Sequence, residues 1–175
     1  STSEPACIIV IAADRMQSRS LRVRRARPGD LDAIAGVWHA SAQAMDGATL
    51  RIESVAELRT RIDHELALGW ALYVATRGGA ILGMLALKPH DAVLDQIFVH
   101  PDAQQDGVGR TLLATAQRLM RDGFTLRMSA TNRRAARFYE TAGLIMIAQA
   151  VHPRTGAPVH HYQWKPPALA PDGDG

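Results

Sequence analysis

The pattern with the clearest chemical potential is the glycine-bearing segment from Gln104 to Gly109. It follows an apolar stretch, residues 93–99, and precedes a segment with helical apolar spacing, so it predicts a strand, a tight turn and a helix. Glycine allows positive φ angles and close approach of a ligand to the backbone. The first N–H groups of a helix lack intrahelical partners and carry about half a positive charge, which suits a pyrophosphate. The same letters also fit a tight turn whose glycines serve geometry alone.

Two other phosphate-binding motifs are excluded by the neighbouring residues. A dinucleotide fingerprint requires a third glycine, and this chain has Leu112 at that place. A P-loop requires Lys and then Ser or Thr after its last glycine, whereas Gly109 is followed by Arg110 and Thr111.

The elements around the turn form one α/β pattern (α+β) over residues 21–164. Apolar alternation and turn residues predict strands over 21–26, 71–76, 80–87, 93–99, 124–130, 144–151 and 159–164. Helices are predicted with Asp30 as N-cap, from the capping-box segment Ser54 to Glu57, from the glycine turn to Gly123, and over 133–142. The order predicts a mixed central sheet of about seven strands flanked by four helices. Residues 1–20 are expected to be an N-terminal extension, disordered or forming a short strand, and 165–175 a flexible tail.

Several motifs at consistent spacing give the chain a resemblance to a known superfamily. They are the segment 95–101 ending in Val99-His100-Pro101, the glycine turn, the segment 129–132 ending in Asn132, the pair Phe138-Tyr139, and Gly143-Leu144. This pattern resembles the GNAT N-acetyltransferase superfamily, and the clear match covers residues 93–147. The resemblance implies a GNAT fold, acetyl-CoA as cosubstrate, and acetyl transfer to a primary amine by direct attack on the thioester.

The resemblance also implies roles for individual residues. The backbone of Ile97, Phe98 and Val99 would pair with the pantetheine arm of CoA like an added strand. Gln104 opens the turn, and the main-chain N–H groups of Gln105, Asp106, Gly107, Val108, Gly109, Arg110 and Thr111 would hold the pyrophosphate. Asn132 would hydrogen-bond the pantetheine region, and Tyr139 would protonate the departing thiolate. From the residues alone, Asn132 also fits an N-cap and Tyr139 a core aromatic beside Phe138.

Asp106 departs from the resembled pattern, in which Lys or Arg often precedes the first glycine. A solvent-exposed carboxylate beside a diphosphate is unfavourable by roughly 1 kcal/mol or less. Arg110 could offset this charge, and we expect weakened CoA affinity rather than its loss.

Several groups are candidates for the base that deprotonates the amine. An alkylamine with a pKa near ~10.4 is protonated at neutral pH, so acyl transfer requires a base or a water chain. Asp95 is the carboxylate within the strand 93–99, and strand parity places it on the same side as Ile97 and Val99. A solvent-facing role for Asp95 fits equally, and His39, His100 or a water chain are the alternatives.

The acceptor pocket is expected over the end of the first helix and the loop after it. In the resembled fold this region, with Trp38, His39 and Met45, covers the acceptor, although core packing also explains Trp38. A small amine, an amino acid, an aminoglycoside or a protein N-terminus all remain open as acceptors.

Composition excludes several other classes of protein. No apolar run reaches the ~18 residues that span a bilayer, and a single cysteine, Cys7, suits a reducing cytoplasm. The seven histidines show no zinc-type spacing, so no metal is expected. The arginines at 22, 24, 25 and 27 have no interleaved aromatics, which favours a solvated strand edge over nucleic-acid binding. We expect a cytoplasmic homodimer that acetylates a small-molecule or peptide amine; the alternative is an acyl-CoA-binding sensor with little catalysis.

Overall fold

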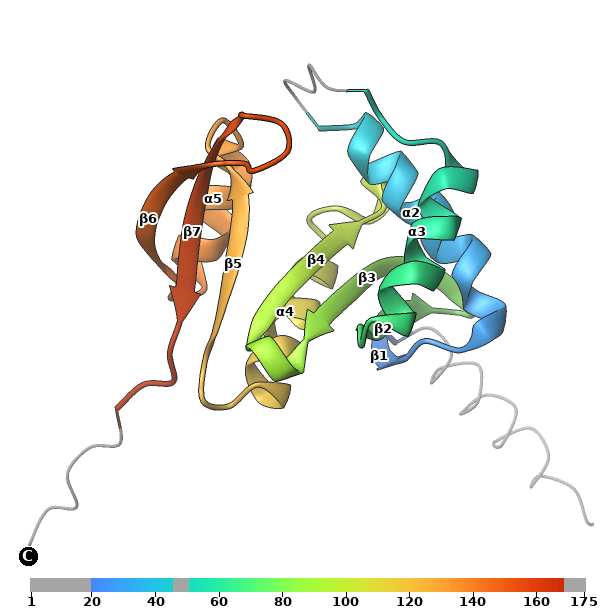
Figure 1. The fold of residues 1–175 in the computed structure, drawn as a ribbon. Coiled ribbons are helices and arrows are strands. Elements are labelled where there is room, and N and C mark those ends of the chain that lie inside the picture. The colour runs from blue at the N-terminus through green and yellow to red at the C-terminus, as the bar shows by residue number, and fades with distance from the viewer. Residues whose placement is uncertain (1–19, 46–50, 169–175) are drawn as a thin grey trace, which may run out of the picture.

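Seven strands form one mixed sheet in the order β1-β2-β3-β4-β5-β7-β6, with helices on both faces (Figure 1). The computed structural model describes residues 20–45 and 51–168. The strands are β1 Arg22–Arg25, β2 Ala71–Arg77, β3 Ala80–Lys88, β4 Val93–Val99, β5 Phe124–Ser129, β6 Ile145–Val151 and β7 Pro158–Trp164. The helices are α2 Leu31–Gln43, α3 Val55–Ala67, α4 Val108–Leu119 and α5 Arg133–Thr141, with short 3-10 turns at Pro28–Asp30, Pro89–Asp91 and Pro101–Ala103. The predicted α/β class, the seven strands and the four helices are confirmed; the predictions for residues 1–19 and 169–175 lie outside the described residues.

The two predicted helix starts behave differently. At α3, the Ser54 hydroxyl accepts from the Glu57 N–H at 3.2 Å and the Glu57 carboxylate accepts from the Ser54 N–H at 2.7 Å, so the capping box is confirmed. At α2, Asp30 occupies the N-cap position but makes no side-chain cap. Its carboxylate instead accepts from the Arg27 N–H at 2.7 Å and from Arg24 at 2.7 and 3.0 Å. The Arg24 hydrogen bond, followed by that of Arg27, lowers the Asp30 pKa to about 2 against the opposing effect of burial.

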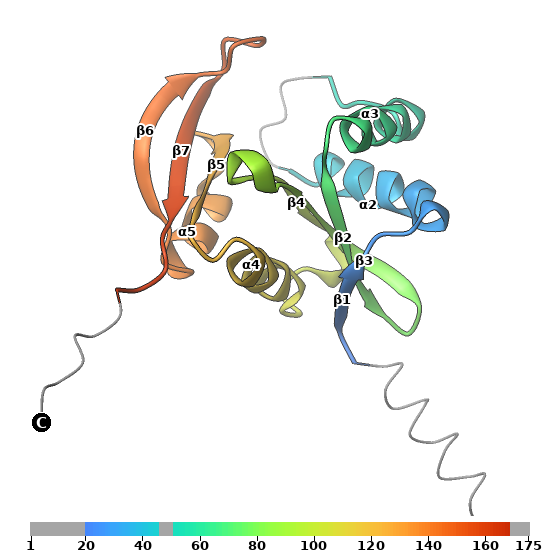
Figure 2. The ribbon, with the colours of Figure 1, turned by 60° about the horizontal axis from the view of Figure 1, so that its bottom comes forward.

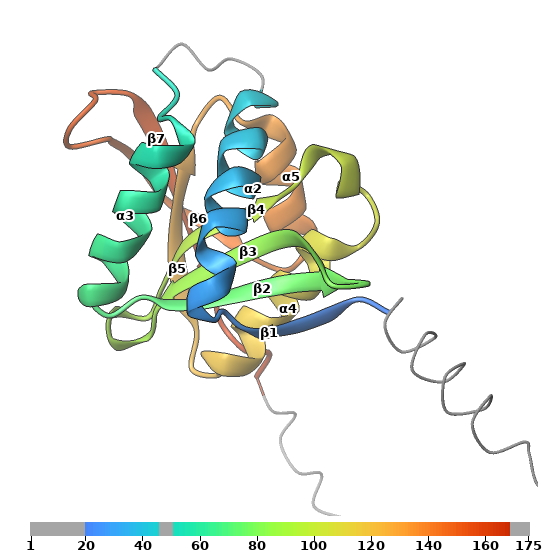
Figure 3. The ribbon, with the colours of Figure 1, turned by 90° about the vertical axis from the view of Figure 1, so that its right-hand side faces the viewer.

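The two faces of the sheet carry separate apolar layers. On one face, Ile34 and Trp38 of α2 and Ile62 of α3 pack over Met84 of β3. On the other face, α4 packs over β3 and β4, and α5 covers the half of the sheet that contains β5, β7 and β6. Figures 2 and 3 show α2 and α3 on the side of the sheet opposite α4. The site therefore has an α2/α3 side and an α4/α5 side.

Strands β4 and β5 are parallel and join only at one end. Their register holds a single pair, Val93 with Thr125, and the Thr125 N–H donates to the Ala92 carbonyl at 3.0 Å. On its other edge β4 pairs with β3 from Val93 to Val99. Beyond Val93, the edge of β4 that faces β5 is thus open to another hydrogen-bonding chain, and the strands diverge in Figure 1.

A β-bulge interrupts β4 at the residue that parity assigned to the site. Leu94 pairs with Leu87 and Gln96 with Ala86, which leaves Asp95 as the extra residue. A bulge shifts the alternation of side chains by one position. The simple parity that placed Asp95 with Ile97 and Val99 therefore does not hold.

Candidate functional site

The glycine turn has the geometry that its letters predicted. After the 3-10 turn Pro101–Ala103, Gln105 and Gly107 both adopt positive φ, 69° and 79°. Gly107 is the N-cap of α4 and provides no side-chain cap, and the Thr111 N–H donates to the Gly107 carbonyl at 3.0 Å. The N–H groups before Thr111 belong to the first helical turn and lack intrahelical acceptors. The left-handed Gln105 was not foreseen, because nothing in its residue type marks a strained backbone.

Gly109 differs from Gly107 both in its backbone angle and in its surroundings. Its φ is ordinary, but an added Cβ would meet the Phe138 ring at 3.4 Å and Val99 at 3.6 Å. These are ordinary contact distances, so Gly109 marks close packing of the turn against α5 and not an unusual backbone angle.

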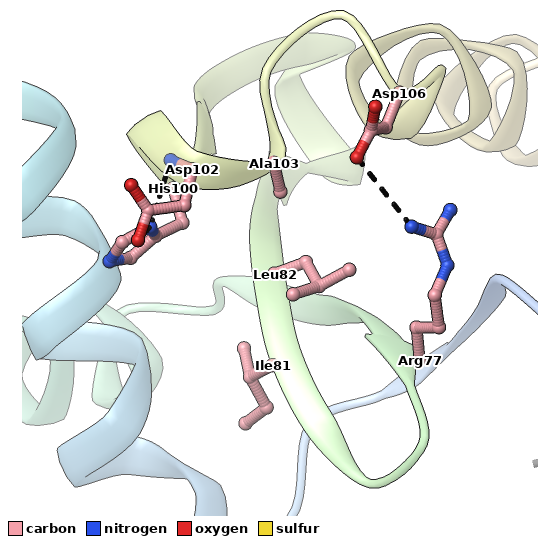
Figure 4. Close-up of a pocket in the computed structure, with 7 residues that line it drawn as sticks. All are labelled: Arg77, Ile81, Leu82, His100, Asp102, Ala103 and Asp106. Atoms are coloured by element: carbon pink, nitrogen blue, oxygen red, sulfur yellow. Dashed lines mark hydrogen bonds and ion pairs between the residues drawn. The ribbon is translucent and has the colours of Figure 1, made fainter. Parts of the chain in front are cut away.

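Arg77, not Arg110, is the cation that balances Asp106. The Arg77 guanidinium at the end of β2 lies 3.7 Å from the Asp106 carboxylate. Figure 4 shows the two side chains pointing toward each other across a shallow cavity. That cavity, of about 390 Å³, is lined by Arg77, Ile81, Leu82, His100, Asp102, Ala103 and Asp106. The expected role of Arg110 is corrected, because the hairpin between β2 and β3 brings a residue distant in sequence to the turn.

Tyr139 lies on the α4/α5 side with its ring in the core. The residue is 7% exposed, and its ring lies 5.3 Å from Phe138 and 6.1 Å from Tyr162. Burial raises the pKa of the Tyr139 hydroxyl above its ordinary value, so the phenol is protonated at neutral pH. In the described part of the chain the hydroxyl has no hydrogen-bond partner, and it is not among the fully enclosed polar atoms that lack one. A phenol that keeps its proton at neutral pH is what a proton donor to a thiolate requires.

Asn132 is the N-cap of α5. Its Oδ1 accepts from the Ala135 N–H at 3.0 Å. This confirms the local structural role, and the side-chain nitrogen has no partner among the described residues. Contact of that nitrogen with a pantetheine arm stays a prediction.

Asp95 lies on the α2/α3 side, which corrects the predicted face. Its Oδ2 accepts from the Trp70 indole N–H at 2.8 Å and lies 3.7 Å from the Lys88 ammonium. Trp70 belongs to the apolar layer under α2 and α3, whereas Ile97 and Val99 pack on the α4/α5 side. The bulge is the physical reason for the difference.

The residues expected at the acceptor pocket differ in exposure. Trp38 is 4% exposed and stacks on Phe98 at 5.5 Å, so its indole supports the site from the core. The His39 Nδ1 donates to the Glu53 carbonyl at 2.9 Å, which leaves Nε2 as the nitrogen that can accept a proton. Met45 is 40% exposed and lies two residues after the end of α2.

The remaining base candidate, His100, is held at the other end of β4. Its Nδ1 accepts from the Asp102 N–H at 3.2 Å and lines the cavity beside Arg77. His100 therefore helps to shape the loop before the glycine turn.

The protein-family comparison identifies the fold that carries this site. The model of the acetyltransferase (GNAT) domain matches residues 69–143, the segment from β2 to the end of α5. Over this segment the chain is similar to the acetyltransferase (GNAT) domain. Phosphinothricin N-acetyltransferase of Alcaligenes faecalis is 35% identical over 104 residues. That match covers 53% of this chain and spans about half (51%) of the relative.

Solved GNAT structures share the fold across nearly their whole length. A GCN5-related N-acetyltransferase from Rhodopseudomonas palustris superposes with a TM-score of 0.67 at 22% identity, covering 83% of this chain and 96% of that one. The putative acetyltransferase yncA from Salmonella typhimurium, solved with its cofactor acetyl-CoA, gives 0.62 at 19% identity, covering 87% and 98%. A ribosomal-protein-alanine N-acetyltransferase from Brucella melitensis gives 0.65 at 17% identity, covering 82% and 99%. At these identities the likeness shows the fold alone.

Other kinds of site find no support in the part of the chain that the structure describes. No group of three or more His, Cys, Asp or Glu side chains within residues 20–45 and 51–168 could hold a metal ion. None of the described helices is long and apolar enough to cross a membrane.

Proposed function

We propose that this protein is a GNAT-type, acetyl-CoA-dependent N-acetyltransferase that moves an acetyl group to a primary amine by direct attack on the thioester. The observation that carries the proposal is the placement of Asp95 and Tyr139 on opposite sides of the sheet. Between them β4 and β5 diverge beyond a single shared pair. A thioester held in this opening meets a carboxylate from one side and a phenol from the other.

The cosubstrate site follows from the backbone. The open edge of Ile97, Phe98 and Val99 supplies N–H and C=O groups for the pantetheine amides. The chain then continues to the turn, where the N–H groups from Gln105 to Arg110 face the pyrophosphate at the start of α4. The Thr111 N–H, also expected there, is already bonded to the Gly107 carbonyl at 3.0 Å. The Asn132 side chain, across the opening on α5, contributes its amide nitrogen.

The chemistry needs three proton transfers. Asp95 takes one proton from the acceptor ammonium, and the neutral nitrogen attacks the thioester carbon to give a tetrahedral intermediate with an oxyanion and a positively charged nitrogen. The C–S bond then breaks as Tyr139 gives its proton to the CoA thiolate. The nitrogen releases its second proton to water, and Tyr139 recovers a proton from solvent. The products are the acetylated amine and free CoA thiol. Trp70 and Lys88 hold one oxygen of Asp95, which leaves Oδ1 for the amine.

The test separates catalysis from binding. We expect Tyr139→Phe to lower the rate of thiol release by about 10²–10⁴-fold with CoA affinity unchanged. Tyr73→Phe, which removes a hydroxyl from β2, is the matched control and should keep full turnover. If Tyr139→Phe turns over at the parental rate, the assignment of the acid is wrong.

The sensor alternative has its own outcome. Calorimetric binding of CoA by the parental protein without thiol release toward any amine of a broad panel would favour an acyl-CoA-binding sensor. Catalysis needs a base, for which Asp95, His39, His100 and a water chain are the candidates, whereas an acyl-CoA-binding sensor needs none of them.

The acceptor panel takes its first members from the similar proteins. Phosphinothricin is one, since a protein that is 35% identical over 104 residues is named for it. A peptide with an N-terminal alanine is another, since a protein of the same fold is named for ribosomal-protein alanine.

We also propose a homodimer in the cytoplasm. Edge strand β6 is exposed along its length, with Ile145 at 66%, Ile147 at 51% and Val151 at 64%. Exposed apolar edge strands tend to be covered by a partner. Light scattering of the parental protein and of Ile145→Lys would test the dimer: a monomeric parental protein contradicts it.

A further inference from the structure

The face of β5 on the α2/α3 side carries an arginine beside the opening. Phe124, Leu126 and Met128 are buried in the apolar layer shared with α4 and α5, so the residues between them point to the opposite side. Arg127 is one of these, and it is exposed. The described helix that packs on this half of the sheet, α5, lies on the other face.

Arg127 and Asp95 lie equally far along their strands from the one pair that β4 and β5 share. Val93 pairs with Thr125, and each of the two side chains lies two residues beyond that pair on its own strand. Both point to the α2/α3 side, Asp95 because of the bulge and Arg127 by alternation. A carboxylate and a guanidinium thus stand at the same level on the two diverging strands.

Two further arginines lie near Arg127. The hairpin between β6 and β7 is closed by the His152 N–H, which donates to the Ala157 carbonyl at 2.8 Å. The Arg154 N–H in the same hairpin donates to the His152 Nδ1 at 3.2 Å. Burial and then the charges of Arg127, Arg154 and Arg61 lower the pKa of His152, so guanidinium groups from β5, the hairpin and α3 surround one imidazole.

Of these three arginines, only Arg61 forms an ion pair with a carboxylate among the described residues. Arg61 pairs with Glu53 at 3.0 Å and lies over the Trp38 ring at 5.0 Å. Neither Arg127 nor Arg154 forms an ion pair with any carboxylate in residues 20–45 and 51–168. Arg127 and Arg154 are thus exposed and without a carboxylate partner among the described residues, whereas Arg61 lies over the Trp38 ring at the edge of the apolar layer.

We infer that the acceptor amine also carries an acidic group, a carboxylate or a phosphorus oxyanion, which binds Arg127 and Arg154 while its amine reaches Asp95. This inference rests on the proposed acetyl transfer and deepens it by naming the acceptor class. Arginine suits the role because its planar fork gives two charge-assisted hydrogen bonds to such an oxyanion. The opposite charges of Asp95 and Arg127 would also orient an amino acid, with its ammonium toward β4 and its acid toward β5.

The experiment compares matched acceptors on the intact protein. Thiol release from acetyl-CoA is measured with phosphinothricin, glutamate and methionine, and with analogues of the same amino acids in which every acidic group is converted to a methyl ester or an amide. We expect the acids to give the higher kcat/KM by about 10-fold or more. The amines of the esters and amides are less basic, so a larger fraction of each is neutral and able to attack at a given pH. Basicity by itself would therefore favour the esters and amides, and it cannot explain a preference for the acids.

Variants assign the preference to the arginines. Arg127→Gln should lower kcat/KM by about 10- to 100-fold for the acids and by less than about twofold for the neutral analogues. Arg118→Gln, an exposed arginine in the last turn of α4, is the charge-matched control and should change neither. The carboxylate and phosphinate probes distinguish the two kinds of oxyanion.

The outcomes keep the inference and the proposed activity apart. Neutral amines acetylated as well as the acids, or equal losses for both classes in Arg127→Gln, would overturn the acidic acceptor and leave the acetyltransferase intact. If no amine is acetylated, a second measurement decides the inference. Amine-free glutarate should then raise the melting temperature of the CoA-loaded parental protein but not of Arg127→Gln, and equal shifts overturn the acidic site.

Discussion

Two glycines of the turn should respond to alanine in opposite directions. Gly107 has φ of 79°, and an added Cβ would meet no atom within 4 Å, so the cost of Gly107→Ala is the backbone conformation alone. A left-handed non-glycine residue costs about 1–2 kcal/mol. Gly109 has an ordinary φ, and its Cβ would make a 3.4 Å contact with Phe138. Gly109→Ala should therefore gain up to about 1 kcal/mol from helix propensity in the first turn of α4.

The difference between the two variants is about 1–3 kcal/mol in the free energy of unfolding. For a domain of this size each kcal/mol corresponds to about 2–4 °C, so the melting temperatures should differ by roughly 2–12 °C. Calorimetry of the CoA-free proteins measures the folding term, and titration with CoA measures the effect on the site separately. Loss of stability in Gly109→Ala, or none in Gly107→Ala, would refute the backbone geometry assigned to the turn.

Three further perturbations test the surroundings of the site. Trp70→Phe keeps an aromatic ring but removes the indole N–H that donates to Asp95 at 2.8 Å. We expect kcat to fall by about 5- to 50-fold with little change in KM or CoA affinity. An unchanged kcat and pH–rate profile would contradict the role of Trp70 in positioning Asp95. Asp106→Asn should tighten CoA binding by up to about fivefold and Arg77→Gln should weaken it similarly, both effects shrinking at high salt in calorimetric titrations. Asp30→Asn should destabilise the protein at neutral pH. Because the folded-state pKa of Asp30 is lowered to about 2, the stabilising contribution of its carboxylate is full above about pH 4 and is lost as the pH falls toward 2. The difference in urea midpoint between the parental protein and Asp30→Asn should therefore shrink over that range, and a constant difference would count against the ion pair.

Local sequence patterns determined the elements and the phosphate turn. Periods of two and of 3.6 residues identify β5 and α4 because one face of each must be buried. The Ser54–Glu57 capping box is a contact between residues three apart, so spacing alone predicts it. Gly107 was identified in the same way, since a helix that begins directly after a strand needs a residue free to adopt positive φ.

The tertiary structure decided which side chains meet across the glycine turn and around Asp95. Arg77 reaches Asp106 only because the β2–β3 hairpin folds back beside the turn, and no local pattern encodes that ion pair. The bulge moved Asp95 to the α2/α3 side, where Trp70 and Arg127 also lie, because one extra residue in a strand reverses every later side chain. The sequence by itself thus determined that a glycine turn and the start of a helix follow β4. The pairing of distant strands decided which charges face the opening beside it, because those contacts depend on register and not on spacing along the chain.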